Sequence, residues 1–427
     1  MTEHAVVPHL TTAQTGPLLT IERHLLDHQT GIETWFRDRW RETPPPFYAS
    51  VDLRNAGFKI SPVDTNLFPA GFNNLSPAFL PLCVQAVQVA MQRVCGEACR
   101  VLLVPESHTR NRFYLESLAT LEAILEQAGY EVRIGTINPE ITRETVIELE
   151  SGRSLRLEPL RREGDRVMVE GYTPCLVLLN NDLSAGRPEI LEGLSQPVVP
   201  PLAIGWANRL KSVHFAHYRD VANEFARLVE LDPWLLQPLF RNCGEVDFMK
   251  GEGVGCLHVN TEKLLREIRA KYEEYGIDQE PVVFVKADSG TYGMGVMTVR
   301  HADEVLALNR KQRTRMSKSK EGLRISNVII QEGVPTSERV DDHAAEPVVY
   351  MIDRYVVGGF YRVHAERGEA DNLNAPGMRF EPLAFAESCI TPDPAREPDA
   401  GPNRFYAYGV VARLALLAAA RELAALG

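Results

Sequence analysis

The sequence predicts a mixed α/β protein, α/β in its N-terminal half and α+β in its C-terminal half. A strand pattern at 100–105, a helix pattern at 112–129 and a strand pattern at 130–135 follow one another at the spacing of a βαβ unit in a parallel sheet. Farther along, two short apolar strand patterns enclose a glycine-rich loop within 281–299. At 427 residues, the chain is long enough for two or three domains with buried cores.

The composition is that of an ordinary globular protein, and it limits the classes of partner. Hydrophobic residues make up 44% and charged residues 24% of the chain, and the net charge is -11. A negative protein is repelled by nucleic acid and by anionic lipid, so we expect small-molecule substrates, no nucleic acid and no membrane as main partners. The sequence has no run of 18 apolar residues and no signal-peptide pattern, and its cysteines are odd in number and lie in apolar contexts. These features predict a cytoplasmic protein with reduced thiols.

The first residues predict an N-terminal helical arm, 1–45, that ends at three consecutive prolines. After it, 48–60 alternates apolar and polar residues as a half-buried strand pair does. The next stretch, 62–75, is rich in Asp, Asn, Pro and Gly but also carries large apolar side chains, so it predicts a loop. Such a loop either lines a pocket or makes a series of Asx turns between two elements.

The βαβ unit predicts where a ligand binds. Its polar loop, 106–111, lies at the carboxyl end of the first strand and at the start of the helix, where open α/β sheets bind ligands. Arg110 in this loop is a candidate for holding a carboxylate, and a solvated helix start is the alternative. A further buried strand pattern, 175–179, ends at a second amide-rich segment, Asn180-Asn181-Asp182. We therefore expect an α/β substrate-binding domain over 46–205.

The region after this domain is predicted to be mostly helical, over 206–280. Helix patterns occur at 214–229 and at 260–275, and Thr261 is a suitable N-cap for the second.

Strands and one helix are predicted for the end of the chain. The apolar run 348–363 predicts a hairpin that turns near Asp353-Arg354. An alanine- and leucine-rich helix pattern over 406–426 predicts a core helix.

The glycine-rich loop follows a strand that ends in a single lysine, Lys286. Glycines let backbone N-H groups form a nest for an anion, which suits a polyphosphate, and a phosphate would give the buried lysine a partner. No Gly-Lys-Ser/Thr follows, and a strand rather than a helix comes next, so the loop is neither a P-loop nor a dinucleotide fingerprint. The alternative is an ordinary hairpin with a surface lysine.

The lysine, the glycine flap 289–296 and the later strand 329–334, which reads IIQEGV, resemble the ATP-grasp superfamily of carboxylate-amine ligases. The order and the spacing of the three features match. The resemblance implies an ATP-grasp-like nucleotide-binding region, with a helical subdomain over 206–280 and a core with its glycine flap over 281–427.

The ATP-grasp resemblance also assigns roles. It implies that Lys286 and the flap contact the phosphates of ATP, and that Gln331 and Glu332 hold adenine and ribose. It implies a second ATP lysine, for which Lys211 and Lys250 are candidates and surface exposure is the alternative. The flap residues expected at the phosphates are Ser289, Gly290, Thr291, Tyr292, Gly293 and Gly295.

Four segments resemble a narrower family, the proteobacterial glutamate-cysteine ligases with an ATP-grasp-like fold. They are 50–59 (SVDLRNAGFK), 63–74 (VDTNLFPAGFNN), 286–295 (KADSGTYGMG) and 372–377 (NLNAPG). The resemblance covers almost the whole chain. It implies the first step of glutathione synthesis, in which ATP, L-glutamate and L-cysteine give γ-glutamylcysteine, ADP and phosphate.

The chemistry of that reaction explains the residue types. A carboxylate is a poor electrophile, so the γ-carboxylate would first be phosphorylated and the acyl phosphate then attacked by the cysteine amine. The protein must neutralise phosphate charge, align the reactants and exclude water. The resemblance implies Lys286, Arg362 and Asn374 as the catalytic residues. The residues expected to bind the amino acids are Arg54, Lys59, Asp64, Asn66, Asn73, Arg110, Asn181 and Asn372.

Magnesium is the expected metal ion, but the sequence departs from the superfamily's usual ligands. ATP-grasp enzymes use an acidic residue and a later Glu-x-Asn pair, whereas the nearest match here is Glu387-Ser388-Cys389. Cysteine is a soft ligand and does not suit magnesium. Glu387 and Asn374 are the metal candidates, and a structural salt bridge is the alternative for Glu387.

Two other functions fit the sequence. A ligase that joins a different amino acid or makes a different dipeptide would keep the ATP residues and change only the N-terminal loops. A nucleotide-binding regulatory or scaffold protein without catalysis would fit the missing Glu-x-Asn pair.

Overall fold

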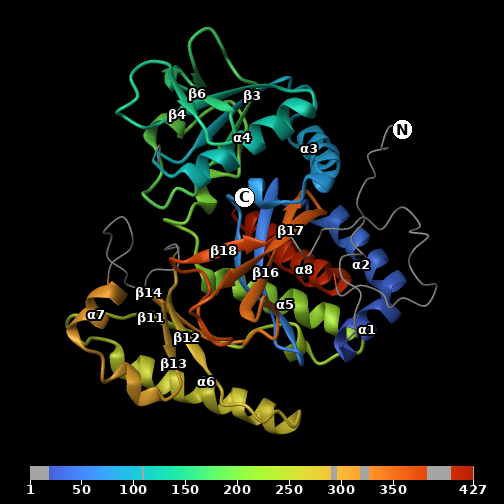
Figure 1. Ribbon diagram of the computed structural model, residues 1–427, viewed down its shortest axis with the longest axis vertical. Helices are drawn as coiled ribbons and strands as arrows, with labels where there is room; N and C mark the ends of the chain where they lie inside the picture. Colours follow the sequence, from blue (N-terminus) through green and yellow to red (C-terminus); the bar gives the residue numbers. More distant parts are fainter. Residues whose placement is uncertain (1–18, 108–109, 290–295, 318–326, 382–404, 427) are drawn as a thin grey trace.

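The computed structural model describes residues 19–107, 110–289, 296–317, 327–381 and 405–426. Within these residues the chain forms three larger sheets, a small hairpin and the helices that cover them (Figure 1). The helices are α1 (Thr20–Asp27), α2 (Gln29–Glu42), α3 (Leu80–Cys95), α4 (Arg112–Gln127), α5 (Lys211–Leu228), α6 (Val254–Glu274), α7 (Arg310–Ser317) and α8 (Phe405–Ala424). The predicted mixed α/β class is confirmed.

The first sheet, here called the N-terminal sheet, is mostly parallel and has the order β10-β9-β3-β4-β6-β5. Its strands are β3 (Arg100–Pro105), β4 (Glu131–Thr136), β5 (Thr145–Glu148), β6 (Ser154–Pro159), β9 (Leu176–Asn180) and β10 (Val198–Val199), and β7 (Arg161–Glu163) and β8 (Arg166–Met168) form the separate hairpin. β3 and β4 pair in parallel and α4 connects them, so the predicted βαβ unit is confirmed. β9 pairs in parallel with the other side of β3, which brings the carboxyl ends of β3 and β9 together.

The second sheet, here called the central sheet, has the order β18-β17-β16-β1-β2, with β15 paired to β16. Its strands are β1 (Tyr48–Asn55), β2 (Ile60–Asn66), β15 (Arg339–Val340), β16 (His343–Ile352), β17 (Tyr355–His364) and β18 (Met378–Glu381). The predicted hairpin is confirmed, because β16 and β17 pair antiparallel around Asp353, which has a φ of 51°. The sheet joins strands from both ends of the chain, since β1 pairs with β16. The predicted domain ranges stay a prediction.

The predicted loop over 62–75 is wrong at its start, because β2 continues to Asn66. β2 is the edge strand of the central sheet. An edge strand tolerates Pro62 and a row of polar side chains, since one side of it makes no ladder hydrogen bonds.

The predicted start of the second helix is also wrong. α6 begins at Val254, after Gly253, whose φ of 77° ends the preceding turn, and Thr261 is a buried residue inside the helix. Leu257, Thr261 and Leu264 form one buried stripe, so packing extends the helix beyond the cap that local propensity suggests.

The third sheet, here called the four-stranded sheet, has the order β11-β14-β12-β13. Its strands are β11 (Phe240–Glu245), β12 (Val283–Ala287), β13 (Val296–Val299) and β14 (Asn327–Glu332), and α6 packs against it. β12 and β13 pair antiparallel, which confirms the two strand patterns beside the glycine loop. The loop residues 290–295 lie outside the described residues.

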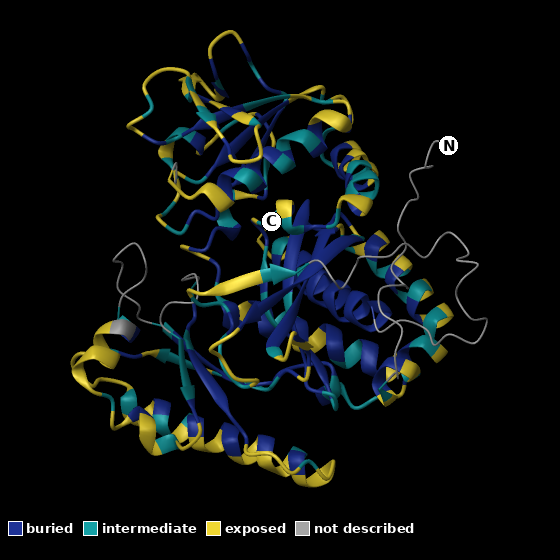
Figure 2. Cartoon of the chain, in the orientation of Figure 1, coloured by how far each residue is buried: buried dark blue, intermediate teal, exposed yellow. Residues whose placement is uncertain are grey.

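Helix α8 occupies one face of the central sheet. Val51 and Leu53 of β1 and Val349 of β16 belong to the same buried core as α8, which also packs against α5. Almost every residue of α8 is buried, as its dark colour in Figure 2 shows, so the predicted core helix is confirmed. Since α8 fills this face, a ligand that binds the described part of the central sheet would lie on the opposite face.

The segment Pro77–Cys95, which contains α3, could cross a membrane by length and composition alone. In the folded chain α3 packs on α4 and on the central sheet, and Cys83, Val87 and Met91 are buried. Core helices of soluble proteins meet the same criterion. The cytoplasmic location stays a prediction.

Candidate active site

Alternating residues of β1 place polar side chains on the open face of the central sheet. Ser50, Asp52 and Arg54 all line a cavity, whereas Val51 and Leu53 between them face the core beside α8. In the neighbouring strands, Asp64 is directly opposite Asp52, and Arg362 is directly opposite Glu346.

Four of these side chains form one ionic network, here called the Arg362 cluster: Asp52, Arg54, Glu346 and Arg362. Arg362 Nη1 donates to Asp52 Oδ2 at 2.8 Å and to Glu346 Oε1 at 2.5 Å. Arg54 Nε lies 2.5 Å from Glu346 Oε2, and its Nη atoms donate to the carbonyls of Glu369 and Asp371. Because both arginines are held from two sides, their positions do not depend on a ligand.

The two carboxylates of the cluster differ in pKa. Burial raises the pKa of Asp52, and Arg362 offsets only part of this effect. Burial also acts on Glu346, but Arg54 and Arg362 together outweigh it and hold the pKa of Glu346 below its usual range. Glu346 therefore stays ionised between the two arginines.

The four-stranded sheet contributes a second cationic group. Lys286 Nζ donates to Gln331 Oε1 at 2.6 Å and to the carbonyl of Val63 at 3.3 Å. Lys211, the first residue of α5, pairs with Asp64 at 2.9 Å. Burial lowers the pKa of Lys286 to about 8. Burial would raise the pKa of Asp64, but Lys211 and Lys286 outweigh it and hold that pKa at about 2.

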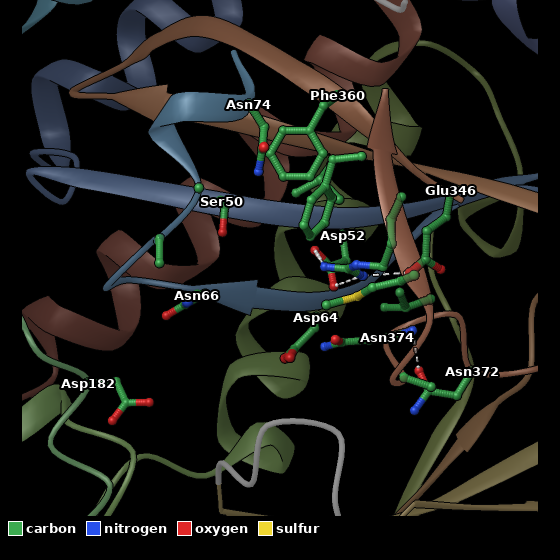
Figure 3. A pocket seen from close by; sticks show the side chains of 18 of the residues that line it. Ser50, Asp52, Asp64, Asn66, Asn74, Asp182, Glu346, Phe360, Asn372 and Asn374 are labelled. Atoms are coloured by element: carbon green, nitrogen blue, oxygen red, sulfur yellow. Dashed lines mark hydrogen bonds and ion pairs between the residues drawn. The ribbon is translucent and has the colours of Figure 1, made fainter. Parts of the chain in front are cut away.

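These groups face one cavity of about 840 Å³ between the three sheets. Figure 3 shows Asp52, Asp64, Glu346 and Asn374 pointing into it, with dashed lines marking the ion pairs of the Arg362 cluster. The predicted site residues that line it are Arg54, Asp64, Asn66, Asn73, Lys286, Arg362, Asn372 and Asn374. Residues far apart in the sequence thus form one site.

The structure contradicts the predicted roles of Lys59 and Glu332. Neither lines the cavity, because both are completely buried and pair with each other at 3.0 Å. Glu332 also accepts from Trp234 Nε1 at 3.2 Å and from the Leu239 amide at 2.8 Å. With these partners, Lys59 is unavailable to a substrate carboxylate and Glu332 to a ribose.

Gln331 and Asn181 also have partners inside the protein instead of the predicted ligands. The oxygen of Gln331 accepts from Lys286, and its side chain is buried away from the cavity lining. Asn181 donates to the Pro105 carbonyl at 3.1 Å and accepts from the Leu183 amide at 2.9 Å. Gln331 therefore orients Lys286, and Asn181 fixes the end of β9.

Three other predicted residues lie outside the cavity lining. Arg110 and Lys250 are exposed, on the turn before α4 and on the turn before α6. Ser289 forms an isolated bridge with Leu210. Gly290, Thr291, Tyr292, Gly293, Gly295 and Glu387 lie outside the described residues.

The sequence reasoning missed Asp52, Glu346, Asn180 and Asp182 as site residues. The alternation in Ser50-Val51-Asp52-Leu53-Arg54 already places Asp52 on the same face as Arg54. Glu346 gives no comparable signal, since only its pairing with Arg362 and Arg54 explains a carboxylate in an apolar strand.

We predict that a nonhydrolysable ATP analogue binds about tenfold more weakly at pH 10 than at pH 7, because a lysine whose pKa is about 8 loses its charge in this interval. The affinity falls as the pH rises because only the protonated lysine carries the charge that attracts phosphate. Titration calorimetry across this range tests it. Lys286→Arg, which stays charged, should bind with little pH dependence, and an unchanged decline in that variant would assign the titration to another group.

Comparison with known proteins gives two strong matches. The family model GshA, glutamate-cysteine ligase, matches residues 22–423. A solved structure from Methylobacillus flagellatus KT, named as a candidate gamma-glutamylcysteine synthetase, is 60% identical with a TM-score of 0.89, and the match covers 99% of this chain and 100% of that chain. No curated protein matches the chain.

Two further solved structures are much less similar. A glutathione synthetase-like effector from Globodera pallida is 10% identical over 83% of this chain and 80% of that chain, with a TM-score of 0.37. A D-alanyl-alanine synthetase A from Vibrio cholerae is 11% identical over 63% of this chain and 68% of that chain, with a TM-score of 0.30.

Proposed function

The chain belongs to the glutamate-cysteine ligase family, and from this premise we propose that its cavity joins the γ-carboxylate of L-glutamate to the amine of L-cysteine, with ATP as the phosphoryl donor. The observation that carries the proposal is the convergence of five cationic side chains on one cavity. They are Arg54, Lys211, Lys286, Arg362 and Arg379. Both ATP and glutamate are anionic, so such a cavity suits their reaction with each other.

In the first step an oxygen of the γ-carboxylate attacks the γ-phosphorus of ATP. ADP leaves with the electron pair of the broken bond, and γ-glutamyl phosphate remains. We assign Lys286 and Lys211 to the phosphates, because both lie at the junction of the four-stranded sheet and the central sheet. Their charges offset the repulsion between phosphate and carboxylate.

Arg362 is assigned to the transferring phosphoryl group. Its Nη1 hydrogens are used by Asp52 and Glu346, whereas Nη2 makes one longer contact of 3.3 Å with Asp52. The second Nη2 hydrogen has no partner among the described residues and thus remains for the substrate. Because Asp52 and Glu346 hold the guanidinium, no reorganisation is needed as charge develops.

In the second step the neutral amine of cysteine attacks the acyl carbon. Phosphate leaves with the electron pair of the carbon-oxygen bond, and the nitrogen loses a proton to give the amide. Neither step requires a nucleophile from the protein, so the side chains act by aligning the reactants and by neutralising charge.

A divalent cation fits the charge of the cavity. The five cations of the lining are balanced by the five carboxylates of Asp52, Asp64, Glu106, Asp182 and Glu346, so the cavity has no net positive charge to offset a triphosphate. Within the described residues no group of three or more His, Cys, Asp or Glu side chains could hold a metal. Magnesium needs no such group, since it keeps waters and binds through one or two carboxylates and substrate phosphates.

We propose Asp64 and the amide oxygen of Asn374 as the protein ligands of Mg²⁺. Both line the cavity, and Figure 3 shows them directed toward the same part of it. The low pKa of Asp64, about 2, keeps its carboxylate ionised. Bound there, Mg²⁺ would supply charge neutralisation to the phosphates.

Release of ADP in the presence of a panel of amino acids tests the proposed function. We expect ADP release that requires L-glutamate and L-cysteine together, with γ-glutamylcysteine identified by mass spectrometry. A different required pair would make the protein another carboxylate-amine ligase. Absence of ADP with every pair would contradict catalysis.

A further inference from the structure

The end of the cavity that the N-terminal sheet forms differs in charge from the Arg362 cluster. Its polar side chains include Glu106, Asn111, Tyr114, Asn180 and Asp182, from the carboxyl ends of β3 and β9 and the start of α4. Across the ranges that the structure describes, no Lys, Arg or His forms an ion pair with Asp182. This end of the cavity is therefore suited to a cationic group, not an anionic one.

One backbone contact holds the Asp182 carboxylate, and another holds its main chain. The Asp182 amide donates to Glu106 Oε1 at 2.7 Å, and Oδ1 accepts from the Ser184 amide at 2.9 Å. Asp182 is 4% exposed but lines the cavity, and Figure 3 shows its carboxylate at the far end of the drawn side chains from Glu346. A buried carboxylate without a cation is unfavourable, so a bound ligand would supply the missing positive charge.

Asn180 gives an independent indication of the same kind of ligand. Its Nδ2 donates to the Pro69 carbonyl at 2.8 Å, which fixes which end of the amide is the oxygen. The Oδ1 atom is buried and has no hydrogen-bond partner, and Asn180 lines the cavity. Buried acceptors are usually paired, so an N-H group of a ligand would complete the hydrogen bonding of this atom. Asn180 and Asp182 are two residues apart at the end of β9, so both acceptors lie on the same side of the strand and in the same part of the cavity.

We propose that Asp182 and Asn180 form an ammonium site that binds the α-ammonium group of L-glutamate and thereby selects an α-amino acid over a plain dicarboxylate. The inference rests on the proposed function. The α-ammonium of glutamate keeps its charge through both steps, so a carboxylate can hold it throughout. The amine of cysteine has to be neutral to attack, and a buried carboxylate would keep it protonated.

The test compares L-glutamate with glutarate, which has the same two carboxylates but no ammonium group. In Asp182→Asn we expect the KM for L-glutamate to rise about 10- to 100-fold, because a charge-assisted contact is lost. The Ki of glutarate as a competitor of L-glutamate should stay unchanged or fall. Asparagine keeps an oxygen for the Ser184 amide, so the turn is preserved. Asp165→Asn, an exposed change in the same part of the chain, should leave both constants within about twofold of wild type.

The possible results separate the inference from the proposed function. Three results would overturn the inference. A parallel rise of the KM for L-glutamate and the Ki of glutarate would indicate a structural role, and a rise confined to the KM for L-cysteine would place the other substrate here. No change in any of these constants would show that Asp182 does not bind a substrate. Absence of ADP release by the wild-type enzyme would instead overturn the proposed function. If thermal unfolding shows that Asp182→Asn is not folded, Asp182→Ser is compared in the same way, with the same expected results.

Discussion

Replacing Arg362 with lysine is expected to lower kcat by about 100-fold or more, while the KM values for L-glutamate and L-cysteine change by less than about fivefold. Lysine keeps the positive charge but cannot reproduce the two-sided contact of the guanidinium with Asp52 and Glu346. The group that meets the transferring phosphoryl would then be misplaced. Because that contact strengthens as charge develops, its loss appears in kcat rather than in KM.

A matched control distinguishes catalysis from packing. Arg413 of α8 is also buried and holds Glu33 through two contacts, at 2.7 and 2.8 Å, but does not line the cavity. Arg413→Lys should therefore reduce stability without reducing kcat more than about threefold. Steady-state kinetics of both folded variants are compared. A kcat for Arg362→Lys within about threefold of wild type would remove Arg362 from the phosphoryl site.

Replacing Lys59 with methionine is expected to lower the free energy of unfolding by about 3 to 5 kcal/mol. The change leaves Glu332 with no cation in a site from which water is excluded, since both side chains are fully buried. Lys59 Nζ also donates to the Gln237 carbonyl at 3.0 Å and lies 4.2 Å from the centre of the Trp234 ring. Lys59 directly precedes β2, and Glu332 is the last residue of β14, so this pair connects the central sheet with the four-stranded sheet.

Denaturant unfolding of three variants measures this prediction. Lys59→Met/Glu332→Gln should be more stable than Lys59→Met alone, because glutamine carries no charge. Trp234 Nε1 and the Leu239 amide donate to different oxygens of Glu332, so the single amide oxygen of glutamine keeps one of these two bonds. Lys250→Met, at an exposed lysine, should change the free energy of unfolding by less than about 0.5 kcal/mol. If Lys59→Met were as stable as wild type, the buried pair would not hold the sheets together.

Local patterns identified most of the strands and helices and several residues of the cavity. The βαβ unit, the β12–β13 pair and the core helix α8 are confirmed because each depends on a hydrophobic period within one stretch of the chain. Lys286, Arg362 and Asn374 line the cavity as expected. Their roles in catalysis stay proposals.

Pairings between distant parts of the chain could not be predicted in the same way. Arg362 and Asp52 are 310 residues apart, and Lys59 and Glu332 are 273 residues apart. A buried lysine has the same appearance in the sequence whether it meets a phosphate or a glutamate. Only the packing of the four-stranded sheet on the central sheet decides between them.

The error at Asn181 has a different physical cause. Side chains at the end of a strand alternate between two directions, so a run of polar residues does not reveal which of them face the ligand. Asn180 and Asp182 line the cavity, whereas both ends of the Asn181 amide bond to the backbone. The direction depends on the neighbouring strands, which the sequence of this segment does not specify.

The most direct test of the proposed mechanism follows the γ-carboxylate oxygen. The enzyme is supplied with ATP, L-cysteine and L-glutamate whose γ-carboxylate carries ¹⁸O in both oxygens, and the released phosphate is analysed by mass spectrometry. If γ-glutamyl phosphate forms in the cavity, one ¹⁸O atom passes to each phosphate, and γ-glutamylcysteine retains the other. Phosphate without ¹⁸O, released together with γ-glutamylcysteine, would contradict the acyl-phosphate mechanism.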